Sequence, residues 1–397
     1  MKALFKKGLR GLVKIYVFMR YDLSYSGEAL EAVEEPFILV SNHVNNADPL
    51  LVSLPIERPI SFVANERFFA QPVAGYFLQL FEAVPKAKFK SDLMTIRGLL
   101  KMKAKGYHIG LFPEGQRSWD GVTGPLIFST AKLVRLMKMP LVGVTIQGGA
   151  LAGPRWAKNN RRGRVHLDYR VIMTQEEVLR SSDLEIHTKM VAALEHDEMA
   201  TQSLEPHPYR GRKPGEGLQR MLYYCPSCLT LDTLRSRGDR LFCTRCGYRV
   251  TYGVYGEFTP GPGEPLFFSN TRDWDRAQQG YLQENLSALE KPHFVKAARV
   301  KTLNDKRILQ SDEVLEVRLE SGKIYLREGY PVKGLSGINI QSNNLLEFYI
   351  DDRTLIQIKF LNPSESVYKW QQALNVIREG LEPRDLSFRQ LTTKANR

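Results

Sequence analysis

Apolar residues of this chain gather in short runs, and these are separated by longer segments with apolar residues every three or four positions. The short runs predict buried parallel strands, namely Phe37–Ser41, Ile60–Ala64, His108–Phe112 and Leu141–Ile146. The longer segments predict helices, namely Pro49–Pro55, Ala74–Phe81, Asp92–Lys105 and Phe128–Lys138. Strands that alternate with helices predict a layered α/β domain with a mostly parallel sheet.

Met1–Tyr21 predicts a basic amphipathic helix ahead of this domain. It contains six cations and no acidic residue. The apolar residues between them recur at helical spacing, and they are Phe5, Leu9, Leu12, Val13, Tyr16 and Met19. Such a helix suits the interface of an anionic membrane, but it could also pack its apolar side on the domain. The aromatic stretch Phe68–Phe81 leaves a similar choice between membrane contact and the protein interior.

The second half of the chain follows a different pattern. Val165–Met173 predicts a late strand, Leu184–Gln202 a closing helix, and the Pro- and Gly-rich segment Pro206–Gly217 a linker. After a helix over Arg272–Leu286 come short strands at Ala297–Leu303, Glu313–Leu319, Lys323–Arg327, Gly337–Gln341, Leu345–Ile350 and Thr354–Phe360. A last amphipathic helix covers Pro363–Arg378. Strands capped by one helix resemble a pleckstrin-homology-like β-barrel, a module that often binds lipids or peptides.

Length and charge narrow the classes of protein. A chain of 397 residues has room for two or three domains. The net charge of +13 implies anionic partners such as membrane lipid, nucleic acid or phosphorylated substrates. The longest uncharged segments, Phe68–Phe81 and Met139–Pro154, are shorter than the roughly 18 residues that span a bilayer. With no secretory signal in the sequence, we expect a cytoplasmic protein that is peripheral on the cytoplasmic face of a membrane.

All four cysteines lie in two CxxC pairs, Cys225 with Cys228 and Cys243 with Cys246. Two such pairs about fifteen residues apart predict a zinc ribbon, in which four thiolates hold a structural Zn²⁺. The alternative is thioredoxin-like redox chemistry, for which one CxxC pair would suffice. Four thiolates fill a tetrahedral site, so we expect this Zn²⁺ to have no catalytic role.

His43 and Asp48 lie five residues apart in a loop that follows the first predicted strand. An imidazole can take a proton from a hydroxyl, and a carboxylate behind it fixes the tautomer and stabilises the cation. The alternative is that Asp48 and Pro49 only start a helix, with Asp48 as its cap. The neighbouring Asn42 could orient the loop or cap it.

A second loop, Pro113–Ser118, follows the strand His108–Phe112. Its Gly115 permits close approach of the backbone to a ligand, and its Arg117 suits bidentate recognition of phosphate. The carboxyl ends of parallel strands share one sheet edge, where ligands bind in open α/β folds. We therefore expect Glu114, Gly115 and Arg117 to lie near His43.

Asn42-His43-x4-Asp48 followed by Phe112-Pro113-Glu114-Gly115-x-Arg117-Ser118 resembles the glycerolipid acyltransferases, specifically the 1-acylglycerol-3-phosphate acyltransferase family. Phe62–Pro85 resembles the second block of that family and Met139–Val144 the fourth. The second block normally ends on Arg, and here Lys88 stands in that place. Lysine still neutralises a phosphate but lacks the planar fork of arginine. The resemblance covers roughly residues 35–175.

This resemblance implies transfer of an acyl group from a thioester of coenzyme A or acyl carrier protein to the hydroxyl of a lysophosphatidate-like acceptor. His43 would be the base and Asp48 its positioning residue. Glu114 and Gly115 would position the acceptor, and Arg117 and Lys88 would bind its phosphate. Asn42 would support the loop.

The resemblance and the patterns together predict seven parts. They are a basic N-terminal helical segment (1–34), an acyltransferase domain (35–204), a linker (205–220), a zinc ribbon (221–255), a helical connector (256–295), a pleckstrin-homology-like domain (296–380) and a tail (381–397). Two other classes of function stay open. One is a non-catalytic lipid-binding or scaffold protein, and the other is a nucleic-acid-binding protein that uses the zinc ribbon.

Overall fold

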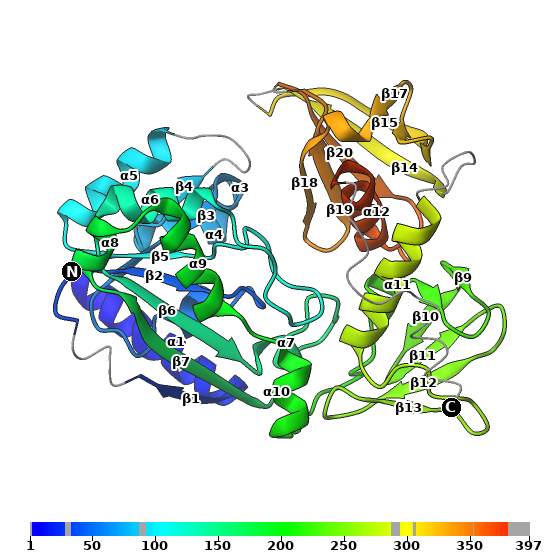
Figure 1. Ribbon diagram of the computed structural model, residues 1–397, viewed down its shortest axis with the longest axis horizontal. Coiled ribbons are helices and arrows are strands. Elements are labelled where there is room, and N and C mark those ends of the chain that lie inside the picture. Colours follow the sequence, from blue (N-terminus) through cyan, green and yellow to red (C-terminus); the bar gives the residue numbers. More distant parts are fainter. Residues whose placement is uncertain are drawn as a thin grey trace. The chain divides into compact units, whose positions relative to one another are not determined.

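The computed structural model describes residues 2–27, 33–86, 93–286, 294–304, 307–351 and 353–379. Lys88 and the predicted tail, 381–397, lie outside these ranges. The chain forms two compact units (Figure 1). The first consists of Met1–Arg155 and Asn160–Gly211, and the second of Trp156–Asn159 and Arg212–Arg397. The finer division into seven parts stays a prediction.

The first unit is built on a seven-stranded sheet with the order β1-β7-β6-β2-β5-β3-β4. Its strands are β1 (Asp22–Ser26), β2 (Ile38–Ser41), β3 (Ile60–Asn65), β4 (Val84–Lys86), β5 (His108–Leu111), β6 (Leu141–Gln147) and β7 (Arg164–Met173). The five strands from β6 to β4 are parallel, whereas β7 is antiparallel to β6 and pairs in parallel with β1. The predicted α/β fold with a mostly parallel sheet is confirmed.

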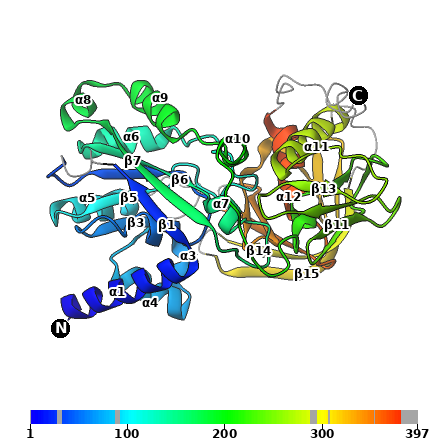
Figure 2. The same ribbon diagram turned by 90° about the horizontal axis from the view of Figure 1, so that it is seen from below.

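Helices cover both faces of this sheet. They are α1 (Lys2–Arg20), α2 (Asp48–Leu51), α3 (Glu66–Phe69), α4 (Pro72–Leu80), α5 (Leu93–Ala104), α6 (Ser129–Met137), α7 (Gly149–Ala152), α8 (Gln175–Arg180), α9 (Asp183–Leu194) and α10 (Glu198–Leu204). In Figure 2, α6, α8 and α9 lie above the sheet and α1 and α4 below it. The helix predicted over Leu184–Gln202 is two helices, because Asp197 caps α10 through the amides of Met199 and Ala200.

Side chains of β2 alternate between two hydrophobic cores. Ile38 and Val40 belong to the core beneath α5, α6 and α9, and Leu39 belongs to the core that includes α1 and α2. Burial on both faces explains why this strand is a continuous apolar run in the sequence. The carboxyl end of β2 is thereby held rigidly between two packed layers.

Helix α1 packs on the rest of the first unit through only a few of its side chains. Val17 and Tyr21 are buried in the core, and the Arg10 guanidinium donates to the carbonyls of Leu54 and Glu57 at 3.0 Å each. Several of the remaining apolar residues are exposed: Leu12 by 65%, Ile15 by 57%, Tyr16 by 52%, Phe18 by 44% and Met19 by 66%. Most of the described residues on the predicted apolar side are therefore not packed on the domain.

The second unit is dominated by antiparallel strands. Around the cysteines lie β8 (Tyr224–Cys225), β9 (Thr230–Leu231), β10 (Leu234–Arg237), β11 (Arg240–Cys243), β12 (Arg249–Tyr252) and β13 (Phe258–Pro260). Short 3-10 helices cover Leu218–Arg220 and Val332–Gly334, and α11 covers Thr271–Leu286. A second seven-stranded sheet consists of β14 (Phe294–Leu303), β15 (Leu309–Glu320), β16 (Lys323–Tyr325), β17 (Gly329–Pro331), β18 (Ser336–Gln341), β19 (Leu345–Tyr349) and β20 (Leu355–Phe360).

Helix α12 (Val367–Glu379) packs on this second sheet through the face predicted from its periodicity. Trp370 is fully buried between the rings of Phe294 and Phe360. Beside it, the fully buried Lys369 Nζ lies 2.5 Å from an Asp232 carboxylate oxygen and 2.7 Å from Glu365 Oε1. Since Asp232 lies between β9 and β10, this ion cluster joins the cysteine-bearing segment to the β-sheet domain.

Candidate functional site

The carboxyl end of β2 leads into a loop in which His43 faces Asp48. The distance from His43 Nδ1 to Asp48 Oδ2 is 2.8 Å, and the same oxygen accepts hydrogen bonds from the amides of Val44 and Asn45. Asp48 is fully buried, and the His43 side chain is 20% exposed. Asp48 starts α2 but does not cap it, because Ala47 is the N-cap and α2 has no side-chain cap. The interpretation of Asp48 as only a cap is therefore wrong.

The geometry assigns a tautomer to His43. An ionised carboxylate can only accept hydrogen bonds, so Nδ1 carries a proton, and in the neutral tautomer the lone pair is on Nε2. Nε2 has no hydrogen-bond partner among the residues that the structure describes. The ring also stacks on Phe112, with 4.3 Å between centroids and 27° between planes. These contacts fix the orientation of the ring and leave Nε2 as the nitrogen that can meet a substrate.

Glu114, just after β5, ties the two loops together. Its Oε1 accepts from the amide of His43 at 2.7 Å, and its Oε2 accepts from the amide of Gly124 at 2.8 Å. Burial raises the pKa of this carboxyl group to about 8, although the two amides act in the opposite direction. Both carboxyl oxygens of Glu114 are thus used by backbone amides. One of them links Glu114 directly to His43, and the other links Glu114 to the loop at Gly124.

Gly115 and Arg117 lie in the same turn. Gly115 has a φ of +69°, and a Cβ there would lie 2.7 Å from Ile127 Cδ1, so a side chain would be strained and crowded. Its amide donates to the Phe112 carbonyl and is used within the turn. Burial lowers the pKa of the Arg117 guanidinium. Arg155 Nη1 supports this turn by donating to the Arg117 carbonyl at 2.5 Å.

Asn42 joins the end of β2 to β6. Its side chain donates to the Ile146 carbonyl at 3.1 Å and accepts from the Ile146 amide at 2.7 Å. Asn42 therefore orients the loop that carries His43, which was one of its two predicted roles. The structure brings Asn42, His43, Asp48, Glu114, Gly115 and Arg117 to one edge of the sheet, whereas Lys88 lies outside the described residues.

Some residues of this site were not predicted to serve it. The Phe112 ring supports the imidazole, and the Ser118 amide donates to the His43 carbonyl at 2.7 Å. Both were visible in the second motif, where only Glu114, Gly115 and Arg117 were given roles. Nothing in the sequence pointed to Gly124, because its contact with Glu114 depends on the path of the loop between them.

The four cysteines converge in the second unit. Their sulfur atoms all lie within 4.8 Å of one another, and Sγ is 3.7 Å from Sγ both for Cys225 with Cys246 and for Cys228 with Cys243. A metal with four thiolate bonds of 2.3 Å in tetrahedral geometry would place its sulfurs about 3.8 Å apart. None of the four is in a disulfide. The donor set therefore fits one metal ion.

Among the helices of the described ranges, none is both long enough and apolar enough to cross a bilayer.

Part of this chain is similar in sequence to known acyltransferases. Residues 22–147 match the family model described as Acyltransferase. The chain is 26% identical over 163 residues to the chloroplastic 1-acyl-sn-glycerol-3-phosphate acyltransferase BAT2 of Brassica napus, and 27% identical over 141 residues to the 1-acyl-sn-glycerol-3-phosphate acyltransferase of Bacillus subtilis. The matches cover 41% and 35% of this chain, and 46% and 65% of the relatives, less than two thirds of either.

A similar solved structure is the 1-acyl-sn-glycerophosphate acyltransferase PlsC of Thermotoga maritima, at 20% identity and a TM-score of 0.42. The match covers 50% of this chain and 79% of that one. The family match at residues 22–147 includes the whole loop from His43 to Asp48 and the turn from Glu114 to Arg117. The part of the chain that carries His43 and Glu114 therefore matches the acyltransferase family model and is similar in sequence to 1-acylglycerol-3-phosphate acyltransferases.

Proposed function

We propose that the first unit transfers an acyl group from an acyl thioester to the free hydroxyl of lysophosphatidate or a related glycerolipid. The observation that carries the proposal is the pair His43–Asp48, joined at 2.8 Å with His43 Nε2 free among the described residues. This is the arrangement that a general base needs in order to take a proton from a hydroxyl. The acyltransferase relatives supply the reaction class.

In this mechanism, His43 Nε2 removes the proton of the acceptor hydroxyl as its oxygen attacks the thioester carbonyl. The carbon–sulfur bond then breaks, and the thiolate that leaves receives a proton from the imidazolium. Asp48 stabilises the imidazolium and holds the ring in place. No covalent acyl-enzyme is needed.

Glu114 acts in this proposal through position, because its two oxygens bind the amides of His43 and Gly124. Arg117, in the same turn, would bind the acceptor phosphate together with Lys88. Gly115 would allow the acceptor to approach the backbone of the turn, where its own amide is already used by the Phe112 carbonyl.

The proposal is tested by supplying purified protein with radiolabelled acyl-coenzyme A or acyl carrier protein and a panel of acceptors. The panel contains lysophosphatidate, glycerol-3-phosphate and a neutral monoacylglycerol. We expect phosphatidate from lysophosphatidate and none from the acceptor that lacks a phosphate. Equal transfer to the neutral acceptor would contradict the roles of Arg117 and Lys88. Absence of product from every donor and acceptor would favour the scaffold alternative.

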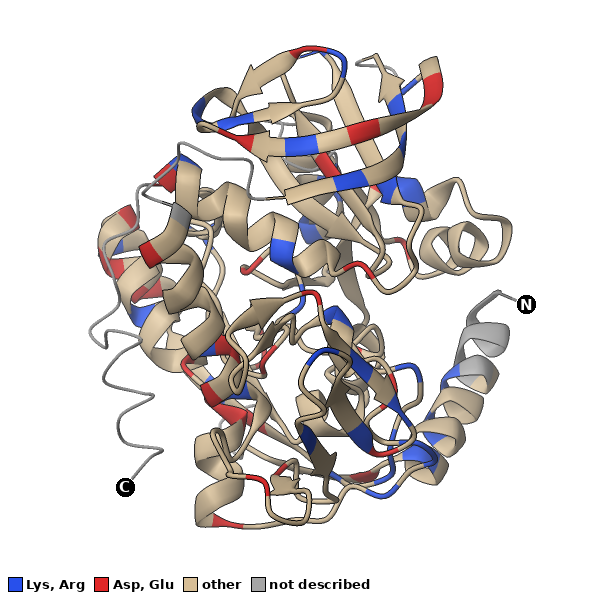
Figure 3. Ribbon diagram, turned by 90° about the vertical axis from the view of Figure 1, so that its right-hand side faces the viewer, with Lys and Arg blue, Asp and Glu red and all other residues tan. Residues whose placement is uncertain are grey.

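We propose further that the protein works as a peripheral protein on the cytoplasmic face of an anionic membrane. Exposed aromatic and aliphatic residues on α1 are accompanied on α4 by Val73, exposed by 71%, Tyr76 by 57% and Phe77 by 39%. Both helices lie on the same side of the sheet in Figure 2. Along α1 basic positions recur with no acidic one (Figure 3), which suits anionic headgroups.

For the second unit we propose a zinc ribbon around the four cysteines, followed later in the chain by a pleckstrin-homology-like domain. Support for Zn²⁺ comes from the four-thiolate donor set, and when bound the ion would be structural, with no position left for a substrate. Two antiparallel meanders, β14 to β17 and β18 to β20, followed by α12 support the domain assignment. Purified protein should contain one equivalent of zinc.

A further inference from the structure

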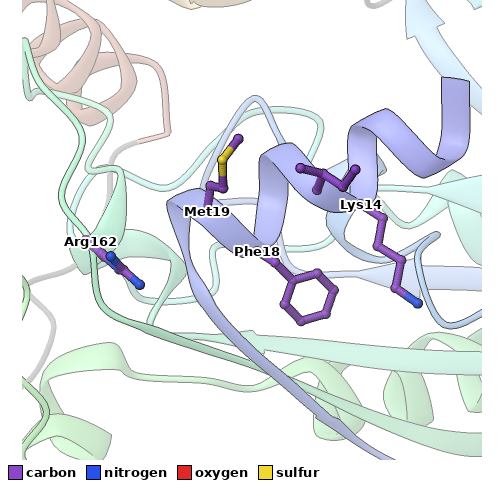
Figure 4. Close-up of a pocket in the computed structure, with 5 residues that line it drawn as sticks. Lys14, Phe18, Met19 and Arg162 are labelled. Carbon is purple, nitrogen blue, oxygen red and sulfur yellow. The ribbon is translucent and has the colours of Figure 1, made fainter.

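A shallow groove of about 760 Å³ lies along the second half of α1. It is lined by Lys14, Ile15, Phe18, Met19 and Arg162. Figure 4 shows Arg162 reaching toward α1 from the loop before β7, with Lys14 on the helix farther along the groove. The groove therefore has one cation on the helix and another on a separate loop.

Both cations are free to meet an anion. Lys14 and Arg162 are exposed, and within the described ranges neither has an ion pair. In lacking an ion pair among the described residues and in being exposed, Arg162 differs from the arginines beside it in the sequence. Arg161 is buried and donates to the Leu151 carbonyl, whereas Arg164 pairs with Glu205. The basic run from Arg155 to Arg164 thus offers one uncommitted guanidinium in the first unit, and it points at α1.

The residues between the cations are apolar and exposed to water. Ile15, Phe18 and Met19 expose 57%, 44% and 66% of their surfaces. Exposed apolar residues that line one groove mark a surface that binds an apolar partner. Two unpaired cations beside that surface complement a molecule with an anionic head and an apolar chain.

The topology places this groove at the edge of the sheet that holds His43. Arg162 precedes β7, which runs antiparallel to β6, so β7 begins where β6 and β2 end. Strands β2 and β7 are separated by β6 alone, a lateral distance of about 10 Å at two strand spacings. A lipid in the groove would therefore lie beside the loop of His43 and Asp48.

We propose that this groove binds one anionic phospholipid of the membrane, distinct from the acyl acceptor. Its phosphate binds Arg162 at one end of the groove and its acyl chain runs over Met19, Phe18 and Ile15, while Lys14 at the other end meets the phosphate of a neighbouring lipid. The inference deepens the proposed membrane contact and rests on it, but it does not require that the protein be catalytically active.

The test compares binding of full-length protein to vesicles of phosphatidylcholine alone and of phosphatidylcholine with phosphatidylglycerol. The variant Lys14→Gln with Arg162→Gln removes both cations. A matched control, Lys101→Gln with Lys132→Gln, removes the same charge from exposed positions on α5 and α6, which pack on the other core. We expect the first variant to lose about 30-fold in partitioning to anionic vesicles, from two headgroup contacts, and the control to lose little.

Met19→Gln should weaken binding to both kinds of vesicle, because it removes apolar contact and leaves the cations in place. Inorganic phosphate should not displace the protein, since it lacks the chain. Equal losses in the variant and the control would mean that diffuse charge drives binding, and would overturn the proposal. So would absence of any anionic preference in the wild type. Acyl transfer is assayed separately, so a vesicle preference without product would contradict only the proposed reaction.

Discussion

Asp48 Oδ2 lies 2.8 Å from His43 Nδ1 and also accepts the amides of Val44 and Asn45. One carboxylate oxygen thus shapes the loop and fixes the tautomer of the imidazole. The two kinds of contact explain the spacing of His43 and Asp48. The residues between them form a turn in which the amides of Val44 and Asn45 point back to the Asp48 carboxylate. The spacing would not bring the two side chains together on a helix, where neighbours are three or four residues apart.

Asp48→Asn should lower kcat on the order of 10²-fold or more with little change in KM. The amide oxygen can still accept from the loop, but the neutral side chain no longer stabilises the imidazolium in the transition state. Steady-state acyl transfer and the circular dichroism melt of the same preparation check this. Asp22→Asn, at an exposed position of β1, is the control. A loss of activity matched by a large fall in Tm would point to a structural role alone.

Glu114→Gln should change how stability depends on pH. The carboxyl group has an ordinary pKa of 4.5, which is raised to about 8 in the folded protein. Between these values the folded state keeps a proton that the unfolded state has lost. The stability of the wild type relative to the variant therefore falls as pH rises from about 4.5 to 8, by at most about 1.4 kcal/mol per pH unit.

Urea unfolding of both proteins at several pH values across this range measures the difference. A constant difference in unfolding free energy would show that Glu114 has the same proton affinity in both states. The hydrogen bonds to His43 and Gly124 make Glu114→Ala a less informative variant, because it would leave both amides without their acceptor.

Cys243→Ser should abolish stoichiometric metal binding and expose the segment 221–255 to proteases. A site that loses one of four thiolates cannot keep its tetrahedral geometry, and small metal modules fold only with their ion. Metal content and limited proteolysis measure this, with Ser227→Ala, a residue of the other CxxC knuckle that is not a thiolate ligand, as a control. Metal content below one tenth of an equivalent in the wild type, purified without chelator, would contradict the metal assignment.

Lys369→Met should destabilise the second unit by about 3–5 kcal/mol, because it leaves the buried carboxylate of Glu365 and the partly buried carboxylate of Asp232 without their main partner. Lys296→Met is the matched comparison. Lys296 contacts the same carboxylates at 3.0 and 3.4 Å but is 29% exposed. Its replacement should therefore lower the free energy of unfolding by less than that of Lys369. Hydrogen exchange of the amides in α12 reports the local stability. Equal protection in the two variants would show that burial of Lys369 is unimportant.

Much of the first unit could be predicted because its central strands are buried on both faces. Each predicted strand of the parallel set ends within one residue of the observed one, as with Ile38–Ser41 against Phe37–Ser41. The edge strands β1 and β4 were not predicted. Asp22–Ser26 is mostly exposed and polar, and it forms a strand only because it pairs with β7, far along the chain.

The site was predictable as a set of residue types and less so as a set of contacts. His43, Asp48, Glu114 and Arg117 follow two strands that end at the same edge of the sheet, which the pattern implied. That both oxygens of Glu114 bind amides of the protein depends on the three-dimensional path of the loop to Gly124. In the basic run from Arg155 to Arg164, which arginines are buried, which are paired and which are exposed without an ion pair likewise depends on tertiary packing.

The most direct test of the central claim is acyl transfer from radiolabelled acyl-coenzyme A to lysophosphatidate, comparing wild type with His43→Ala. The wild type should form phosphatidate, and the variant should be slower by a factor on the order of 10²–10⁴, the contribution of a general base. Circular dichroism should show that the variant is folded, because the His43 side chain is partly exposed and contributes little to the core. Turnover near the wild-type rate in a folded variant would show that His43 is not the base.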